Sequence, residues 1–141
     1  MAANVGSPPF DPELTPALAI SPFPKPLTDE HIPKIREFAE SISGFNESDY
    51  PTVTHEEYRF PGPEKNELII SLFRPKDLPV SSPAPCIYFM HGGGFYHGTR
   101  FNGAALPIEW AKLFGGIVVS VEYRAAPENR APALQTRPPW V

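Results

Sequence analysis

Four runs of apolar residues along the chain predict four strands. The segments 53–60 and 68–73 are separated by a turn-rich stretch and predict an antiparallel pair. Cys86–Met90 and Ile117–Tyr123 are apolar almost throughout, which is typical of strands covered on both faces of a parallel sheet. A helix predicted over 104–114 joins these two runs in a strand–helix–strand crossover. The pattern therefore predicts an α/β domain with a mostly parallel sheet.

Two helices are predicted from apolar side chains that recur at three- and four-residue spacing. The first begins at Thr28, followed by acidic residues that suit a helix start, and ends at Gly44. Its apolar face consists of Ile32, Ile35, Phe38, Ala39 and Ile42. The second is expected to be capped by Asn102 and to end at Gly115. Its buried face is expected to consist of Leu106, Trp110, Leu113 and Phe114.

Proline is unevenly distributed and sets the boundaries of the predicted domain. The chain contains 20 prolines in 141 residues, about three times the usual share. Residues 1–27 hold seven of them, which predicts a flexible, extended arm rather than a helix or central strand. Residues 134–141 contain a Pro-Pro pair and predict an irregular tail. The folded domain is therefore expected over residues 28–133.

Charge and cysteine content exclude several classes of function. A net charge of −4 with scattered basic residues argues against nucleic-acid binding. The single Cys86 is expected to be a small core residue, which excludes an internal disulfide and favours a reducing compartment. Because no signal peptide or run of about 20 apolar residues is present, we expect a cytoplasmic chain without a membrane span. The sequence contains no Cys/His cluster typical of a zinc site.

A glycine-rich loop is the strongest candidate for chemistry in this chain. His91-Gly92-Gly93-Gly94-Phe95 directly follows the predicted strand Cys86–Met90. Consecutive glycines let the backbone approach a ligand closely, and their N–H groups can converge on one anionic oxygen. A phosphate-binding loop is excluded because no Gly-Lys-Ser/Thr follows, whereas a plain tight turn remains an alternative.

A second motif gives the glycine loop its family context. Residues 118–128 read VVSVEYRAAPE, which resembles the strand and turn of the hormone-sensitive-lipase-like branch of the α/β-hydrolases. Glu122 and Ala125 depart from that branch, where Asp and Leu are usual. Residues 68–75 end in Arg-Pro and are similar to the preceding strand of the same branch. The resemblance extends over roughly residues 28–133, and an HGGG-type loop is itself a feature of esterases and lipases with this fold.

The resemblance implies a partial α/β-hydrolase fold and a set of site residues. The N–H groups of Gly93 and Gly94 would form the oxyanion hole. The supporting residues of the loop would be His91, Gly92, Tyr123, Arg124 and Glu128. The helix that begins at Thr28 would either be part of the cap over the active site or pack on the sheet edge. The family needs no metal or organic cofactor, and its ligands are small esters or hydrophobic molecules.

The catalytic triad of such hydrolases is not found in this sequence. None of the nine serines lies in Gly-x-Ser-x-Gly, and no Ser, Asp or His follows Glu128. We therefore interpret the chain as the N-terminal half of a carboxylic ester hydrolase that ends before the nucleophile and is inactive alone. The alternative is a non-catalytic binding or regulatory protein, because related plant gibberellin receptors keep the loop and use the pocket for binding. The sheet order of the family would place the strand Cys86–Met90 at an exposed edge of such a truncated sheet, which favours self-association.

Overall fold

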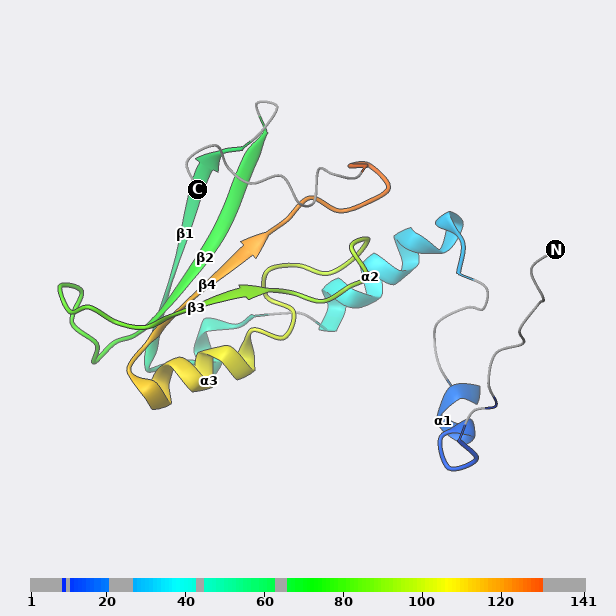
Figure 1. Ribbon diagram of the computed structural model, residues 1–141, viewed down its shortest axis with the longest axis horizontal. Helices are drawn as coiled ribbons and strands as arrows, with labels where there is room; N and C mark the ends of the chain where they lie inside the picture. Colours follow the sequence, from blue (N-terminus) through cyan, green and yellow to red (C-terminus); the bar gives the residue numbers. More distant parts are fainter. Residues whose placement is uncertain (1–8, 10, 21–26, 43–44, 63–65, 131–141) are drawn as a thin grey trace.

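The structure is a computed structural model that describes residues 9, 11–20, 27–42, 45–62 and 66–130. Figure 1 shows a twisted sheet with the helix labelled α3 beside it. The elements in chain order are α1 (Thr15–Ala19), η1 (Asp29–His31), α2 (Ile32–Ile42), η2 (Glu47–Asp49), β1 (Val53–Pro61), β2 (Glu67–Pro75), β3 (Cys86–Met90), α3 (Ala105–Phe114) and β4 (Ile117–Glu122).

The four strands form one sheet in the order β1-β2-β4-β3. β1 and β2 form an antiparallel hairpin, and β2 is also antiparallel to β4. β3 and β4 are parallel because α3 carries the chain back between them. The expected strand–helix–strand unit is thus confirmed. Among the described strands the sheet is mixed rather than mostly parallel, since the hairpin and the β2–β4 pairing both run antiparallel.

The core lies between one face of the sheet and α3. Phe73 of β2 and Val118 of β4 are fully buried on this face, against Ile108 and Ala111 of α3. Ala104, just before the helix, is also buried in this cluster. The small side chains of Ala104 and Ala111 let the helix backbone approach the sheet closely. The larger Ile108 side chain fills the space that remains between α3 and the sheet.

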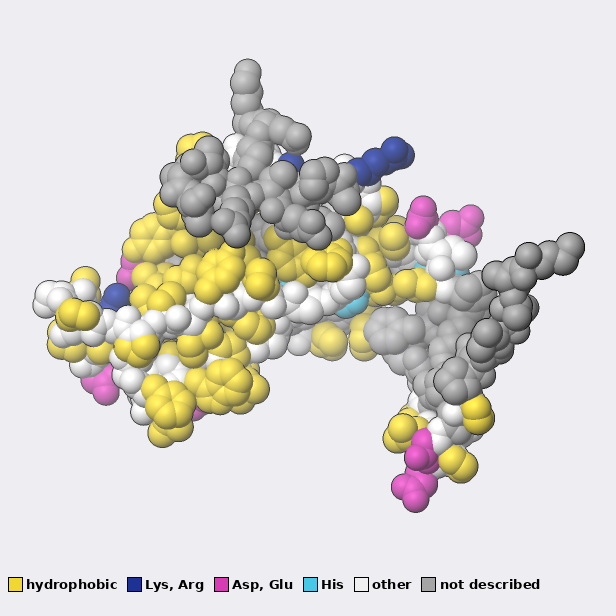
Figure 2. All heavy atoms as spheres, viewed as in Figure 1, with side chains coloured by type: hydrophobic (Ala, Val, Ile, Leu, Met, Phe, Trp, Pro, Cys, Tyr) yellow, Lys and Arg dark blue, Asp and Glu magenta, His cyan; other side chains and the backbone are white. Residues whose placement is uncertain are grey.

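The predicted buried face of α3 is wrong. Leu106, Trp110, Leu113 and Phe114 are all exposed, whereas Pro107, Ile108 and Ala111 are buried. Two apolar stripes run along this helix at the same spacing, so periodicity alone does not select between them. Figure 2 shows the outer stripe as hydrophobic side chains gathered over α3.

Two local predictions also need correction. Asn102 does not cap α3, because the N-cap is Ala104 and the Asn102 carboxamide oxygen accepts from the Thr99 N–H at 2.6 Å instead. The arm 1–27 contains the short helix α1, in which Pro16 lies within the first turn and interrupts no helical hydrogen bond. Gly115 ends α3 in the left-handed conformation, as predicted (φ 63°). The predicted stop at Gly44 and the tail 134–141 lie outside the described residues.

β3 forms one edge of the described sheet and is exposed on one face. Tyr88 and Met90 are 60% and 64% exposed, while Ile87 and Phe89 pack against the core on the α3 side. Cys86 lies on the same face as Tyr88 and is exposed, so its expected core position is wrong. The reason is that no helix of the described residues covers this face. No described helix is long and apolar enough to cross a membrane.

The orientation of α3 predicts a clear difference between two truncations on this helix. Ile108→Ala is expected to lower the free energy of unfolding by about 2–5 kcal/mol, because it leaves a cavity at a buried site. Leu113→Ala removes an exposed side chain and is expected to stay within about 0.5 kcal/mol of wild type. Urea unfolding of both variants measures the difference. A larger loss for Leu113→Ala would restore the face predicted from sequence.

Candidate functional site

The glycine loop leaves β3 with an unusual backbone. Gly93, Gly94 and Phe95 have positive φ angles of 128°, 57° and 66°. A Cβ atom at Gly93 would lie 1.9 Å from the His97 carbonyl oxygen, so only glycine fits there. The Gly93 carbonyl accepts from the N–H groups of Tyr96 and His97, both at 3.1 Å, which closes the loop into a tight turn.

The N–H groups of Gly93 and Gly94 are left available by this turn. Among the described residues, neither donates to a backbone or side-chain acceptor. Gly94 is exposed and lines a cleft of about 230 Å³. Gly94, one of the two predicted donors, therefore lines the cleft, and the oxyanion role of both glycines stays a prediction.

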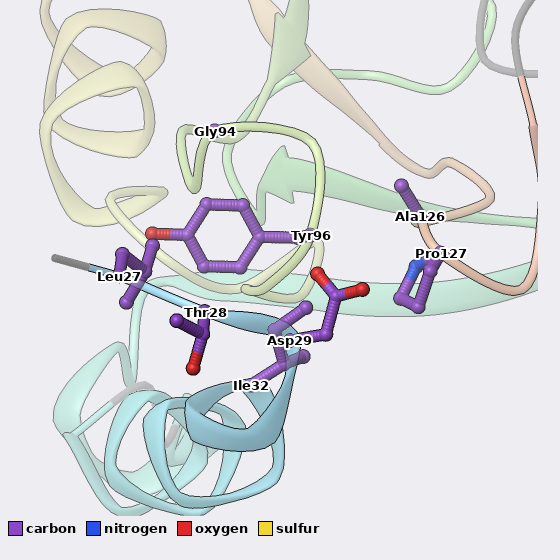
Figure 3. A pocket seen from close by; sticks show the side chains of 8 residues that line it. All are labelled: Leu27, Thr28, Asp29, Ile32, Gly94, Tyr96, Ala126 and Pro127. Atoms are coloured by element: carbon purple, nitrogen blue, oxygen red, sulfur yellow. The ribbon is translucent and has the colours of Figure 1, made fainter.

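Three separate segments form the walls of this cleft (Figure 3). The first is the start of α2 with the residues before it, the second is the glycine loop, and the third is the turn after β4. The lining residues are Leu27, Thr28, Asp29, Ile32, Gly94, Tyr96, Ala126 and Pro127. In Figure 3 the Tyr96 ring lies between the loop and the helix, and the Asp29 carboxylate lies between Tyr96 and Pro127. Apolar walls with a few polar groups are typical of small-molecule sites.

His91 braces the loop from beneath. Its ring is buried and stacks on Tyr123, with centroids 4.0 Å apart and planes at 8°. The His91 Nδ1–H donates to the Gly92 carbonyl at 2.7 Å, and the Tyr123 hydroxyl donates to the His91 carbonyl at 2.8 Å. Burial, followed by the nearby Glu122 charge, raises the pKa of Tyr123, so the phenol keeps its proton as a donor at neutral pH. His91 and Tyr123 thus hold the start of the loop.

Glu128 supports the site through a residue that the sequence reasoning missed. The Arg36 guanidinium binds both Glu128 carboxylate oxygens at 2.8 Å and also donates to the carbonyls of Tyr96 and Ala126. This arginine lowers the pKa of Glu128 to about 2, so the carboxylate is ionised at neutral pH. Arg36 and Glu128 are 92 positions apart, and no spacing within the sequence signals such a pair. Arg124 is partly buried beside Tyr123, and its supporting role stays a prediction.

Arg100 anchors the far end of the loop to the sheet. Its backbone N–H and Nη1 both donate to Glu122 Oε2, at 3.0 and 3.1 Å, and its Nε donates to the buried Ser71 hydroxyl at 2.8 Å. The Ser120 hydroxyl in turn donates to the Arg100 carbonyl at 2.6 Å. Glu122 therefore connects the end of β4 to the chain that follows the glycine loop.

One arrangement imitates a catalytic triad but lacks access. His55 Nε2 lies 2.9 Å from the Ser71 hydroxyl, and His55 Nδ1 lies 3.6 Å from a Glu47 carboxylate oxygen. Ser71 is fully buried, and the Arg100 Nε already donates to its hydroxyl. The His55 ring stacks on Phe73 at 4.9 Å. No substrate reaches this serine, so the cluster is structural.

The remaining histidines form no metal site. No group of three or more His, Cys, Asp and Glu side chains within the described residues could hold an ion. Burial, and then the neighbouring His91 and Arg36, lowers the pKa of His97, so this ring is neutral near pH 7. His31 binds Thr28 at the start of α2, where its Nδ1 accepts from the Thr28 N–H at 3.1 Å.

The chain is similar to several known proteins. The α/β-hydrolase fold family matches residues 87–136. A probable carboxylesterase of Arabidopsis thaliana is 34% identical over 92 residues, covering 60% of this chain and 27% of that protein. A gibberellin receptor of Oryza sativa subsp. japonica is 45% identical over 58 residues, covering 40% and 16%. A bacterial heroin esterase superposes with a TM-score of 0.68 at 29% identity, covering 88% of this chain and 38% of the esterase.

These similarities define the class of protein. The described sheet has the fold of a partial α/β hydrolase, and the chain is similar to esterases with that fold. The chain spans between a sixth and two fifths of the length of the relatives described above.

Proposed function

We propose that this chain supplies the oxyanion hole of a carboxylic ester hydrolase. The observation that carries the proposal is the pair of N–H groups at Gly93 and Gly94, which have no acceptor within the described residues, together with the cleft that Gly94 lines. Similarity to an Arabidopsis carboxylesterase and to a bacterial heroin esterase supports it. The ligand class is a small ester or a hydrophobic molecule that fits beside Tyr96 and Ile32.

The chemistry of the loop follows from the reaction it would serve. When a nucleophile attacks an ester carbonyl, the oxygen gains negative charge in the tetrahedral intermediate. Two fixed N–H donors stabilise that charge without reorganising, because the turn already holds them in place. His91, Tyr123 and Arg100 keep this geometry from the sheet side. None of the serines in residues 1–141 lies in a Gly-x-Ser-x-Gly motif, so the proposal assigns the nucleophile to no residue of this chain.

The isolated chain is expected to be inactive. No serine lies in a nucleophile motif, and the buried Ser71 and Ser120 are inaccessible. Hydrolysis of short-chain aryl esters by residues 1–141 is expected not to exceed that of a heat-treated sample. A fluorophosphonate probe is expected to label no serine, as judged by mass spectrometry. Stoichiometric labelling of one serine would show that the chain has its own nucleophile.

A loop transplant tests the oxyanion assignment directly. Residues 90–98 replace the structurally equivalent segment of the bacterial heroin esterase, and kcat and KM are measured. The transplant is expected to stay active, and Gly93→Ala within it to lower kcat by about 10²–10³ with a smaller change in KM. The reason is that a Cβ atom collides with the His97 carbonyl and displaces the donors.

Gly92→Ala serves as the matched control in the same transplant. Gly92 takes part in the loop through its backbone carbonyl, which alanine keeps, and a Cβ atom there meets no other atom within 4 Å, so kcat should stay near that of the unmodified transplant. Circular dichroism verifies that all variants are folded. If the Gly93→Ala transplant keeps its kcat, the N–H groups of this loop do not form the oxyanion hole.

A second candidate function is ligand binding without turnover. It is favoured by the similarity to the rice gibberellin receptor, whose 45% identity exceeds that of the Arabidopsis carboxylesterase. In this case the same cleft would hold a hydrophobic ligand and the loop would bind a polar group on it. The transcript sequence beyond the codon for residue 133, where the family resemblance ends, distinguishes the two functions. An esterase requires a Gly-x-Ser-x-Gly motif there with a later acid and histidine, whereas a binding protein does not.

We also propose that the chain self-associates through β3. This edge strand has no charged residue, and its Tyr88 and Met90 are more than half exposed. Sedimentation velocity is expected to show oligomers, and Tyr88→Lys, which places a charge on the edge, is expected to shift the chain toward monomer. A monomeric wild-type chain with one sharp thermal transition would contradict this.

The cytoplasmic location stays a prediction.

A further inference from the structure

One side chain connects the three walls of the cleft. The Arg36 Nε donates to the Tyr96 carbonyl at 2.8 Å, and Nη2 donates to the Ala126 carbonyl at 2.7 Å. Nη1 and Nη2 also bind the two Glu128 carboxylate oxygens, each at 2.8 Å. These acceptors lie in the glycine loop and in the turn after β4, while Arg36 itself belongs to α2. One guanidinium therefore fixes three segments far apart in sequence.

The same segments contain the residues that line the cleft. Ile32 lies one helical turn before Arg36 and contributes the α2 wall. Tyr96 and Ala126 contribute to the loop and turn walls, and their carbonyls are the acceptors of Arg36. The Ala126 N–H also donates to the Phe95 carbonyl at 2.8 Å, which joins the loop to the turn directly. The width of the cleft thus depends on the geometry around one arginine.

The arrangement differs from an ordinary surface ion pair. The Arg59 guanidinium binds Glu57 and Glu67, which lie on its own strand and on the adjacent strand, and its side chain is 54% exposed. Such pairs contribute little. The Arg36 side chain is only 30% exposed. Two of its four hydrogen bonds go to the backbone carbonyls of Tyr96 and Ala126, whereas the partners of Arg59 are carboxylates of side chains. A planar guanidinium reaches all four acceptors at once, whereas a lysine ammonium is a compact point charge.

We infer that Arg36 is a positioning residue that holds the glycine loop and the turn after β4 against α2, and so sets where Gly94 presents its N–H to the cleft. This inference rests on the proposed function for its catalytic meaning. The clamp itself is a property of the described residues and is tested without any ester.

Hydrogen exchange in the chain as purified tests the clamp. The reporters are the amides of Tyr96 and His97, which donate to Gly93, and that of Ala126, which donates to Phe95. Arg36→Gln is expected to raise their exchange rates by about tenfold or more. In the wild-type chain the loop and the turn can open only when the guanidinium contacts break, and the variant removes that cost of opening. Amides that pair β2 with β4 are expected to keep their wild-type rates.

Two further variants make the result specific. Arg36→Lys keeps the charge but not the planar fork, so only partial protection is expected to return. Arg59→Gln removes an exposed arginine of the same type from β1 and is expected to leave all three amides unchanged. Unchanged reporters in Arg36→Gln, full protection in Arg36→Lys, or a uniform rise throughout the sheet would each overturn the inference. If Arg36→Gln does not fold, Arg36→Lys alone decides: partial protection of the three reporters supports the inference, and full protection overturns it.

The outcome is independent of the proposed activity. Failure of the loop transplant to support esterase turnover leaves the exchange data unaffected. Conversely, reporter amides that exchange without protection in the wild-type chain would disprove the positioning role of Arg36. The oxyanion assignment would be unaffected, because it depends on Gly93 and Gly94.

Discussion

The left-handed backbone of three consecutive residues, Gly93 to Phe95, is the constraint on which the site depends. Positive φ at a residue with a side chain, such as Phe95, costs free energy and persists only where the surroundings fix it. The surroundings here are the His91–Tyr123 stack beneath the loop, Arg36 beside it and Arg100 beyond it. Each contact comes from a different segment, so the loop conformation is a product of the assembled fold rather than of local sequence.

Much of the fold can be predicted from the sequence because the elements concerned are determined by residues that lie close together in the chain. The hairpin, the crossover and the Gly115 helix stop all have short-range causes, namely a turn between strands, a helix-length spacer and a left-handed C-cap. The requirement for glycine at position 93 is equally local, since a Cβ atom there would collide with His97, whereas the loop conformation as a whole is held by distant segments. Roles carried over by resemblance, such as that of Arg124, depend on contacts that the sequence pattern does not specify.

The wrong or missed predictions share one physical origin, namely that a sequence pattern is compatible with two different placements of the same side chains. α3 has two apolar stripes, and the one with smaller side chains packs inward because alanines permit a closer approach. Cys86 lies in an apolar run, yet a run of that kind does not reveal whether both faces are covered. Arg36 reads as an ordinary polar position on an amphipathic helix, since its acceptors are backbone carbonyls and a glutamate 92 positions away.

The position of β4 has a consequence for how the chain folds during synthesis. β4 is the last of the described strands to be made, yet it lies between β2 and β3. The β2–β4 ladder joins residues such as Phe73 and Val118, which are 45 positions apart. Non-local pairings of this kind form slowly, because the entropy of closing the loop is lost before the contacts compensate. Until Ile117–Glu122 leaves the ribosome, the hairpin and β3 have nothing to join them, so this is the interval in which a chaperone would matter most.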